Sequence, residues 1–246
     1  MWTPSALARE AKPLKAEVWR IVEAQHRVST MQLTDTLEEQ AILEALIEEA
    51  KPKIPEAAAH LDWLLSTPFR YAPYPHGSRF RRAGQRQGAF YASLAVETAL
   101  AEFAFYRLLF FAQAPDARIP SGPADLTAFR SSVATETALA LNAPPLDADR
   151  AAWEHLTDYS ACQDLADAAR AAEVGALVSR SVRDPRGGAN VTVLTPAAFA
   201  KPKPTARQTW RLLLRPNGAR AWSDLPSKRQ VEFTRDDFAA DPRLAI

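Results

Sequence analysis

The chain has 246 residues, 47% of them hydrophobic and 24% charged, and its formal net charge is +1. These values are typical of a soluble globular protein with one large domain or two small ones, and the balanced charge argues against direct binding to nucleic acid or an anionic membrane. The single cysteine, Cys162, and four scattered histidines exclude a disulfide framework and a zinc site. With no recognisable signal peptide or membrane-spanning run, we expect a cytoplasmic protein without a metal.

The first half of the chain is predicted to contain both strands and helices. A charged, helical N-terminus precedes a strand over residues 16–23, where apolar and polar side chains alternate. Residues 36–50 have helical spacing, with Thr34 or Thr36 as the N-cap, and a second helical run covers 56–65. The segment 67–88, rich in proline, glycine and arginine, is predicted to be irregular. A strand over 88–92 then leads into a helix from Leu94 to about Phe111, capped by Ser93.

The second half is predicted to contain more strands than helices. In chain order we expect strands over 126–132 and 136–142, a helix over 159–172, a strand over 175–179, a turn over 184–188 and a strand over 191–194. Beyond a Lys-Pro linker, three short strands over 209–214, 219–222 and 230–234 form a β extension. Strands and helices without a regular alternation indicate the α+β class. We assign residues 1–200 to one domain with a helical insertion over 31–66, and residues 201–246 to the extension, packed on that domain.

Glu102 is the only acidic residue in the apolar run Leu100–Phe111. Burying an unpaired carboxylate costs several kcal/mol, so a carboxylate in such a run is paired, exposed or functional. From the pattern alone, an ion pair with Arg107 or another arginine, or simple exposure, is the plainer interpretation.

Arginines cluster in the segment 77–82, which contains Arg79, Arg81 and Arg82. Arginine suits bidentate contact with phosphate, and Gly77 and Gly84 allow the backbone to approach an anion closely. A solvated basic loop is the plainer interpretation of this segment alone. RNA binding, which would also use Arg86, is a third interpretation, and the balanced net charge and the lack of a recognisable RNA-binding motif weaken it.

Ser181 lies between a predicted strand and a predicted turn, where a serine either bonds a ligand or caps the turn. No Gly-x-Ser-x-Gly motif surrounds it, so we do not predict a hydrolase nucleophile. The chain also lacks a Walker loop and a Gly-x-Gly-x-x-Gly motif after a strand. The histidines have no partner at catalytic spacing, and we interpret them as structural or exposed: His26, His60, His76 and His155.

Several motifs follow one another in a specific order. An arginine on an early strand (VWRIVE) is followed by Gly-Ser-Arg-Phe, by Gly-Ala-Phe-Tyr-Ala-Ser with a later Thr-Ala-Leu-Ala-Glu, and by Ser-Val-Arg-Asp-Pro. This order, from about Val18 to about Phe199, resembles the RES domain family, which is named for its Arg, Glu and Ser. The most specific part is residues 88–102, and residues 159–190 are the second strong match.

The resemblance implies a fold similar to that of ADP-ribosyltransferase toxins, with NAD⁺ bound as the substrate in a cleft between small sheets. The family's functional positions fall on Arg20, Arg79, Tyr91, Glu102 and Ser181. Of these, Glu102, Arg20 and Ser181 are the expected catalytic residues, and Arg20, Arg79, Tyr91 and Ser181 are the expected NAD⁺-binding residues. The chain departs from the family pattern at Ile21, where compact members often carry an aromatic residue, and at Ser78, which replaces a glycine. Its long helical insertion between Arg20 and Arg79 resembles an extended branch of the family.

By the same resemblance, the chain is expected to be a toxin that cleaves the nicotinamide–ribose bond of NAD⁺, as a glycohydrolase or a phosphorylase. One alternative is a mono-ADP-ribosyltransferase with an essential protein as acceptor, and another is a non-catalytic binding module with the RES fold. The implied partner is a small antitoxin with a helix-turn-helix domain, which would block the arginines with an anionic group. The insertion Thr34–Leu65 offers a further docking surface, although packing on the core is the plainer interpretation.

Overall fold

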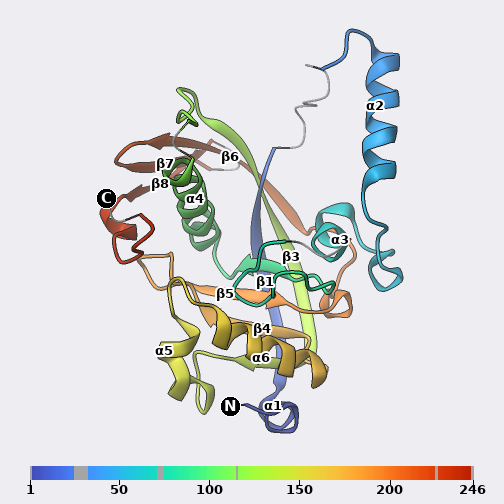
Figure 1. The fold of residues 1–246 in the computed structure, drawn as a ribbon, viewed down its shortest axis with the longest axis vertical. Helices are drawn as coiled ribbons and strands as arrows, with labels where there is room; N and C mark the ends of the chain where they lie inside the picture. Colours follow the sequence, from blue (N-terminus) through green and yellow to red (C-terminus); the bar gives the residue numbers. More distant parts are fainter. Residues whose placement is uncertain (1, 25–32, 71–74, 115, 225–226, 245–246) are drawn as a thin grey trace.

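The computed structural model describes residues 2–24, 33–70, 75–114, 116–224 and 227–244. A mixed sheet forms the centre of the molecule, and helices lie against it on several sides (Figure 1). The predicted α+β class is confirmed, since strands and helices mix without regular alternation.

The described strands form one eight-stranded sheet in the order β1-β2-β5-β4-β3-β6-β7-β8, with a further pairing between β1 and β3. Their bounds are β1 (Lys12–Glu23), β2 (Phe90–Ser93), β3 (Ala124–Ala140), β4 (Ala176–Arg180), β5 (Ala189–Val193), β6 (Ala206–Arg215), β7 (Gly218–Ser223) and β8 (Arg229–Thr234). Of the strand pairs in the described residues, only β3 and β4 are parallel, and the others are antiparallel. Because β1 pairs with both β2 and β3, strands β1, β2, β5, β4 and β3 form a closed ring of pairings. Strands β6 to β8 extend the sheet outward from β3.

Strand β3 is one continuous strand where we predicted two. Strand β1 pairs along it from Glu23 opposite Leu126 to Lys12 opposite Ala138. The residues between the two predicted strands contain neither glycine nor proline, so the pairing with β1 continues through them. The opposite edge of β3 is divided, because residues 124–130 pair with β6 and residues 138–140 pair with β4. This strand therefore joins the two parts of the sheet.

The α-helices are α1 (Pro4–Glu10), α2 (Leu37–Ala50), α3 (Trp63–Arg70), α4 (Val96–Gln113), α5 (Arg150–Trp153) and α6 (Ser160–Ala171). Short 3-10 turns are η2 (Glu56–Ala58), η3 (Leu146–Asp149), η4 (Pro196–Ala198) and η5 (Asp236–Phe238). No described helix is both long and apolar enough to cross a membrane.

Helix α4 begins later than predicted, and Ser93 does not cap it. Ser93 ends β2, and its hydroxyl donates to Asn190 Oδ1 at 2.7 Å. Ala95 occupies the N-cap position without a side-chain hydrogen bond. Glu97, the acidic residue of the first turn, forms an ion pair with Arg229 of β8. Ser93 therefore links β2 to β5 through its hydrogen bond to Asn190 and does not cap the helix.

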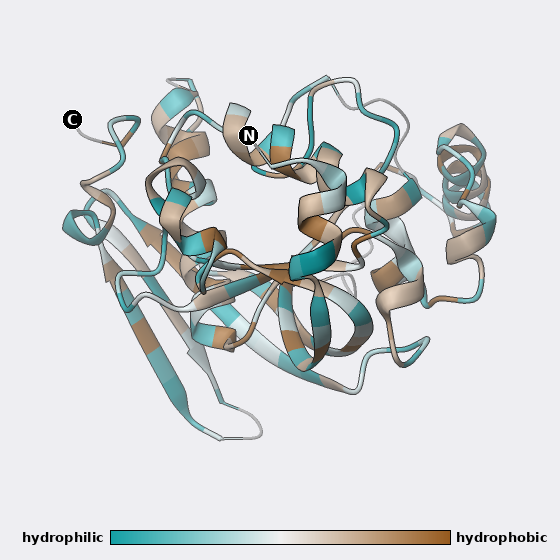
Figure 2. Ribbon diagram, turned by 90° about the horizontal axis from the view of Figure 1, so that it is seen from below, coloured by the Kyte–Doolittle hydropathy of each residue, from teal (hydrophilic) through white to brown (hydrophobic). Residues whose placement is uncertain are grey.

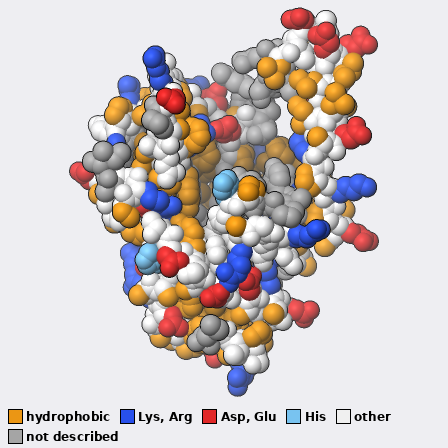
Figure 3. Space-filling view, viewed as in Figure 1, with side chains coloured by type: hydrophobic (Ala, Val, Ile, Leu, Met, Phe, Trp, Pro, Cys, Tyr) orange, Lys and Arg blue, Asp and Glu red, His pale blue; other side chains and the backbone are white. Residues whose placement is uncertain are grey.

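The first part of the predicted insertion is a helix that stands away from the body. Helix α2 has Thr36, one of the two predicted candidates, as its N-cap, and Thr36 Oγ1 accepts from the Glu39 N–H at 3.1 Å. No residue of α2 is buried, and Leu37 and Leu46 are 79% and 57% exposed. Figure 3 shows apolar and acidic side chains together along this helix. Packing on the core, the plainer interpretation, is therefore wrong for α2; residues 31 and 32 lie outside the described residues.

The second part of the insertion does pack on the core. The helix predicted over 56–65 is replaced by η2 and by α3, which extends into the segment predicted to be irregular. Asp62 explains the break, because its Oδ1 accepts from the Leu64 N–H at 2.9 Å and starts a new helix. Leu65 and Phe69 of α3 are buried beside Phe199 in the core.

Buried apolar residues form three clusters around the sheet, and Figure 2 shows hydrophobic residues on both strands and helices. The first lies between α4 and β6 to β8 and includes Phe105 and Trp210. The second joins α3 to β2 and β3 through Phe129. The third lies under α6 and includes Phe80 and Leu165. The three clusters hold α4, β2 and the loop around Phe80 in fixed relative positions.

Candidate active site

A cavity of about 320 Å³ lies where β1, β2, β5, α4 and the loop before Phe80 meet. Its volume is near the lower end of the range for small-molecule sites, roughly 300–1,000 Å³. It brings together four residues that are far apart in the sequence: Arg20, Arg79, Tyr91 and Glu102. The other lining residues include Trp19, Phe80, Phe103, Tyr106, Tyr159, Arg183 and Asn190. Aromatic walls with a few convergent polar groups are typical of a ligand site.

Glu102 reaches the cavity from the middle of α4 and is half-buried. It forms no ion pair with Arg107, which instead pairs with Glu23 at 3.0 Å. Glu102 Oε1 accepts two hydrogen bonds, one from Ser181 Oγ at 2.7 Å and one from Asn190 Nδ2 at 2.6 Å. Among the described residues, both bonds fall on the same oxygen, so the second oxygen is left for a ligand. The two donors fix the carboxylate in one orientation.

Asn190 is a site residue that our sequence analysis missed. Its side-chain orientation is set by Ser93, whose hydroxyl donates to Oδ1 and so directs Nδ2 toward Glu102. The pairing of β2 with β5 places Ser93 directly opposite Asn190. Asn190 lies at the end of the second motif match, over residues 159–190, but nothing in the sequence marks its side chain as a partner of Glu102, and only the strand register reveals the contact.

Ser181 lies behind Glu102, and the cavity lining does not include it. Its side chain is buried, with 2% of the residue exposed. Its oxygen accepts from the N–H groups of Arg183 at 3.2 Å and Asp184 at 3.0 Å. Because both lone pairs of the hydroxyl are occupied, its proton is directed to Glu102. Ser181 thus caps the turn, as the plainer interpretation held, and contacts the acid as well.

Arg20 and Tyr91 form the wall made by β1 and β2. Arg20 Nη1 donates to the Tyr91 carbonyl at 2.7 Å, and its guanidinium lies 5.0 Å from the centre of the Phe90 ring. The Tyr91 hydroxyl accepts from the Phe80 N–H at 3.1 Å and bonds Ser78 Oγ at 2.8 Å. Burial raises the pKa of this phenol more than those hydrogen bonds lower it, so Tyr91 is a neutral anchor for the loop. Ser78, which departs from the family pattern, therefore contributes a hydroxyl to this anchor.

Arg79 lines the cavity while also holding two other segments together. Its Nε and Nη2 donate to the Trp153 carbonyl at 3.1 and 2.6 Å, and Nη1 donates to the Arg180 carbonyl at 2.9 Å. This fork joins the end of α5 to the end of β4. These contacts fix the orientation of the Arg79 guanidinium, whose remaining N–H groups could donate to an anion bound in the cavity.

The other arginines of the loop serve the fold more than the cavity. Arg82 pairs with Asp164 and Asp167 of α6, and Arg81 Nη2 donates to the Gln85 carbonyl. The Arg82 side chain is 41% exposed, so it is solvated as the plainer interpretation held, and it is also paired with two carboxylates. Arg86 is exposed. Two carboxylates neutralise the charge of Arg82, which weakens the interpretation of this loop as an RNA-binding surface, because such a surface binds phosphates through unneutralised arginines.

The histidines are dispersed in the structure. His155 Nδ1 accepts from the N–H groups of Thr157 and Asp158, which is a local structural role. His60 is exposed, and His26 lies outside the described residues. In the described ranges, no three residues of the metal-binding types gather into a group that could hold an ion.

The RES domain family matches residues 53–215. This range includes Arg79, Tyr91, Glu102 and Ser181, whereas Arg20 lies before it. No curated protein matches the sequence. Among solved structures, the chain is similar to one in the crystal structure of the M. tuberculosis MbcT–MbcA toxin–antitoxin complex, with 13% identity, a TM-score of 0.46, and coverage of 82% of this chain and 90% of that chain.

Proposed function

The chain belongs to the RES domain family, and on that premise we propose that it is an NAD⁺-consuming toxin that cleaves the bond between nicotinamide and ribose. The observation that carries the proposal is the carboxylate of Glu102, held by two donors at the wall of a cavity that also exposes Arg20 and Arg79. We further propose that the fold is of the ADP-ribosyltransferase type, with this cavity as the NAD⁺ cleft.

Glu102 would stabilise the transition state of bond cleavage. Nicotinamide leaves as a neutral base, so positive charge develops at the ribose carbon during the reaction. A fixed carboxylate beside that carbon favours the transition state over the substrate, because the charge is absent before the bond stretches. The Glu102 oxygen that accepts no hydrogen bond from Ser181 or Asn190 is the one available to stabilise this charge.

The arginines would bind the diphosphate of NAD⁺. Arg20 and Arg79 line the same cavity from different elements, and guanidinium groups bind phosphate oxygens bidentately. Aromatic rings in the wall, Trp19 and Tyr106 among them, offer stacking surfaces for the nicotinamide. Such contacts would fix the ribose against Glu102 before cleavage.

Ser181 would position the acid. Its proton is directed to Glu102 and its lone pairs are occupied by backbone N–H groups, so its geometry does not favour nucleophilic attack. The group that attacks the ribose is water in a glycohydrolase and inorganic phosphate in a phosphorylase. The second candidate function is transfer to a side chain of an essential protein, which the same cavity would also support.

The partner we propose is a small antitoxin with a helix-turn-helix domain, as the family implies. An acidic or carboxyl-terminal group of that protein would enter the cavity toward Arg20 and Arg79. Helix α2, with Leu37, Ile42 and Leu46 exposed, offers it a second surface.

The test is nicotinamide release from NAD⁺ by the purified chain, with and without phosphate and with a candidate protein acceptor. Glu102→Gln keeps the shape of the side chain and removes the charge, and we expect it to abolish release while the protein stays folded. Glu136→Gln is the matched control, because Glu136 is exposed on β3. In a bacterial host, the wild type should arrest growth and Glu102→Gln should not. Harmless expression of the wild type with unchanged cellular NAD⁺ would contradict the toxin assignment.

A further inference from the structure

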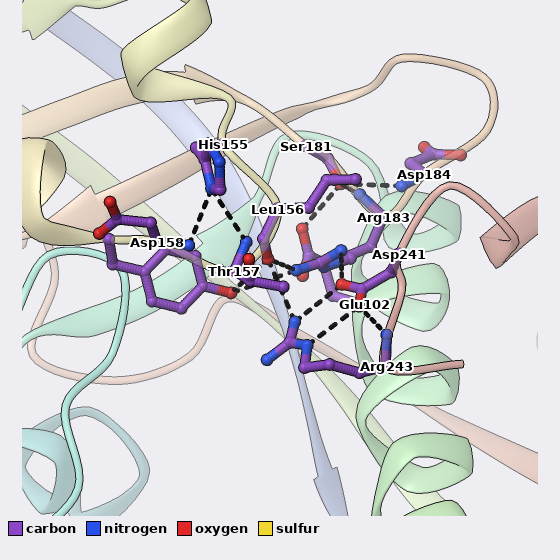
Figure 4. Close-up of polar contacts among 11 residues, drawn as sticks. Glu102, His155, Leu156, Thr157, Asp158, Ser181, Arg183, Asp184, Asp241 and Arg243 are labelled. Carbon is purple, nitrogen blue, oxygen red and sulfur yellow. Dashed lines mark hydrogen bonds and ion pairs between the residues drawn. The ribbon is translucent and has the colours of Figure 1, made fainter. Parts of the chain in front are cut away.

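A buried ion pair links the C-terminal segment to the neighbourhood of the cavity. Arg183 Nη1 pairs with Asp241 Oδ2, and their side chains are only 2% and 1% exposed. Arg243 adds a contact to the same carboxylate at 2.8 Å. Burial by itself would raise the pKa of the Asp241 carboxyl, but the hydrogen bonds from Arg243 and the charge of Arg183 lower it. Figure 4 shows Arg183, Asp241 and Arg243 gathered beside Glu102 and Ser181.

The guanidinium of Arg183 is enclosed on its other sides as well. It lies 4.0 Å from the centre of the Phe105 ring of α4, and Nη2 donates to the Tyr159 hydroxyl at 3.1 Å. Tyr159 itself lines the cavity. In this enclosure, Asp241 is the group that compensates the positive charge most directly.

The same residue, Arg183, is part of the turn that holds Ser181. The backbone N–H groups of Arg183 and Asp184 donate to Ser181 Oγ, which donates to Glu102 Oε1. The far side of the turn is tied to α4, because Asp184 Oδ2 accepts from Thr98 Oγ1 at 2.7 Å. The turn is therefore anchored twice, to α4 through Asp184 and to the C-terminal segment through Arg183.

We propose that Asp241 is a positioning residue for the acid: through Arg183 it holds the turn 181–184, and through Ser181 it orients Glu102. This inference rests on the proposed function of Glu102. Asp241 lies beyond residue 215, where the family match ends, so the C-terminal extension completes the site of the RES domain. Loss of the Asp241 charge would draw the Arg183 guanidinium toward water and move the N–H groups that align Ser181.

The test compares Asp241→Asn with Arg229→Gln. Both variants remove one ion pair between the C-terminal extension and the rest of the chain, but the Arg229–Glu97 pair is partly exposed and neither residue lines the cavity. We expect Asp241→Asn to lower kcat for nicotinamide release about tenfold or more with little change in KM. Arg229→Gln should leave kcat within about twofold of the wild type.

A double-mutant cycle separates positioning from general damage. In a Ser181→Ala background, Asp241→Asn should cause no further loss of kcat, because the path to Glu102 is already broken. Multiplicative losses in the cycle would overturn the proposal. If Asp241→Asn does not fold, Arg243→Gln, which removes only the more exposed partner of Asp241, should give a smaller loss with the same dependence on Ser181.

An independent measurement does not use activity at all. Amide hydrogen exchange over residues 181–188 should quicken in Asp241→Asn and stay unchanged in Arg229→Gln. If the wild type releases no nicotinamide, the proposed function fails, and the exchange measurement still decides whether Asp241 holds the turn. Unchanged exchange in Asp241→Asn would overturn the positioning role even for an active enzyme.

Discussion

Replacing Asn190 by alanine tests whether the orientation of Glu102 matters for activity. The variant removes the 2.6 Å hydrogen bond from Nδ2 to Glu102 Oε1 and leaves only the Ser181 bond on that oxygen. A hydrogen bond to a charged group contributes about 1.5–3 kcal/mol, and about 1.4 kcal/mol corresponds to a factor of ten in rate. If most of that energy holds Glu102 in its working orientation, kcat should fall roughly ten- to a hundredfold.

The same change also affects stability, and the two effects must be separated. Ser93 is 2% exposed and loses its acceptor on Asn190, which costs about 1–3 kcal/mol in the free energy of unfolding. The assay is therefore initial-rate nicotinamide release well below the melting temperature of the variant. Asn142→Ala, at an exposed asparagine, is the matched control.

A further variant sharpens the outcome. Asn190→Asp keeps the shape but places an oxygen against Glu102 Oε1, so at neutral pH it should lower kcat more than Asn190→Ala does. If Asn190→Ala has wild-type kcat while Glu102→Gln is inactive, the reasoning about orientation is refuted.

Three more predictions follow from contacts elsewhere in the structure. Arg79→Lys should lower kcat/KM about tenfold or more although the charge is kept, because one ammonium group cannot reach both the Trp153 and Arg180 carbonyls. An equal loss of kcat/KM in Arg86→Ala would contradict this prediction. Leu65→Ala should cost about 2–5 kcal/mol in the free energy of unfolding, measured by urea denaturation, whereas Leu46→Ala in the exposed helix α2 should stay within about 0.5 kcal/mol. The folded protein lowers the carboxyl pKa of Asp241 below its ordinary 3.8 and that of Glu17 below its ordinary 4.5. Each ionised carboxylate therefore stabilises the fold at pH values above its ordinary pKa, and this stabilisation is lost as the pH falls through the lowered pKa of the folded state. The melting temperature should fall in that acid range, and it should fall less steeply in Asp241→Asn; a parallel fall would contradict the assignment.

The sequence predicted the parts of this protein that depend on local chemistry. Side-chain alternation located the second part of β1, which begins four residues before the predicted strand over 16–23. Helical spacing over 36–50 located α2, and of the two threonines offered as its cap the structure uses Thr36. Motif order identified the RES domain family, and the family match over residues 53–215 confirms it. Local rules were less reliable where a long-range partner competes for a side chain, as at Ser93, which bonds Asn190 instead of capping α4.

The tertiary structure alone decided how the site is assembled. Glu102 could have paired with Arg107 on the same helix, but Arg107 pairs with Glu23 and the acid turns to Ser181 and Asn190. The contacts of Asp241 with Arg183 join positions 58 residues apart, and no local pattern marks either as a partner of the other. Periodicity and capping act within a few residues, so they are readable in the sequence. Which donor reaches a buried carboxylate depends instead on strand register and on the packing of distant segments, which only the folded chain determines.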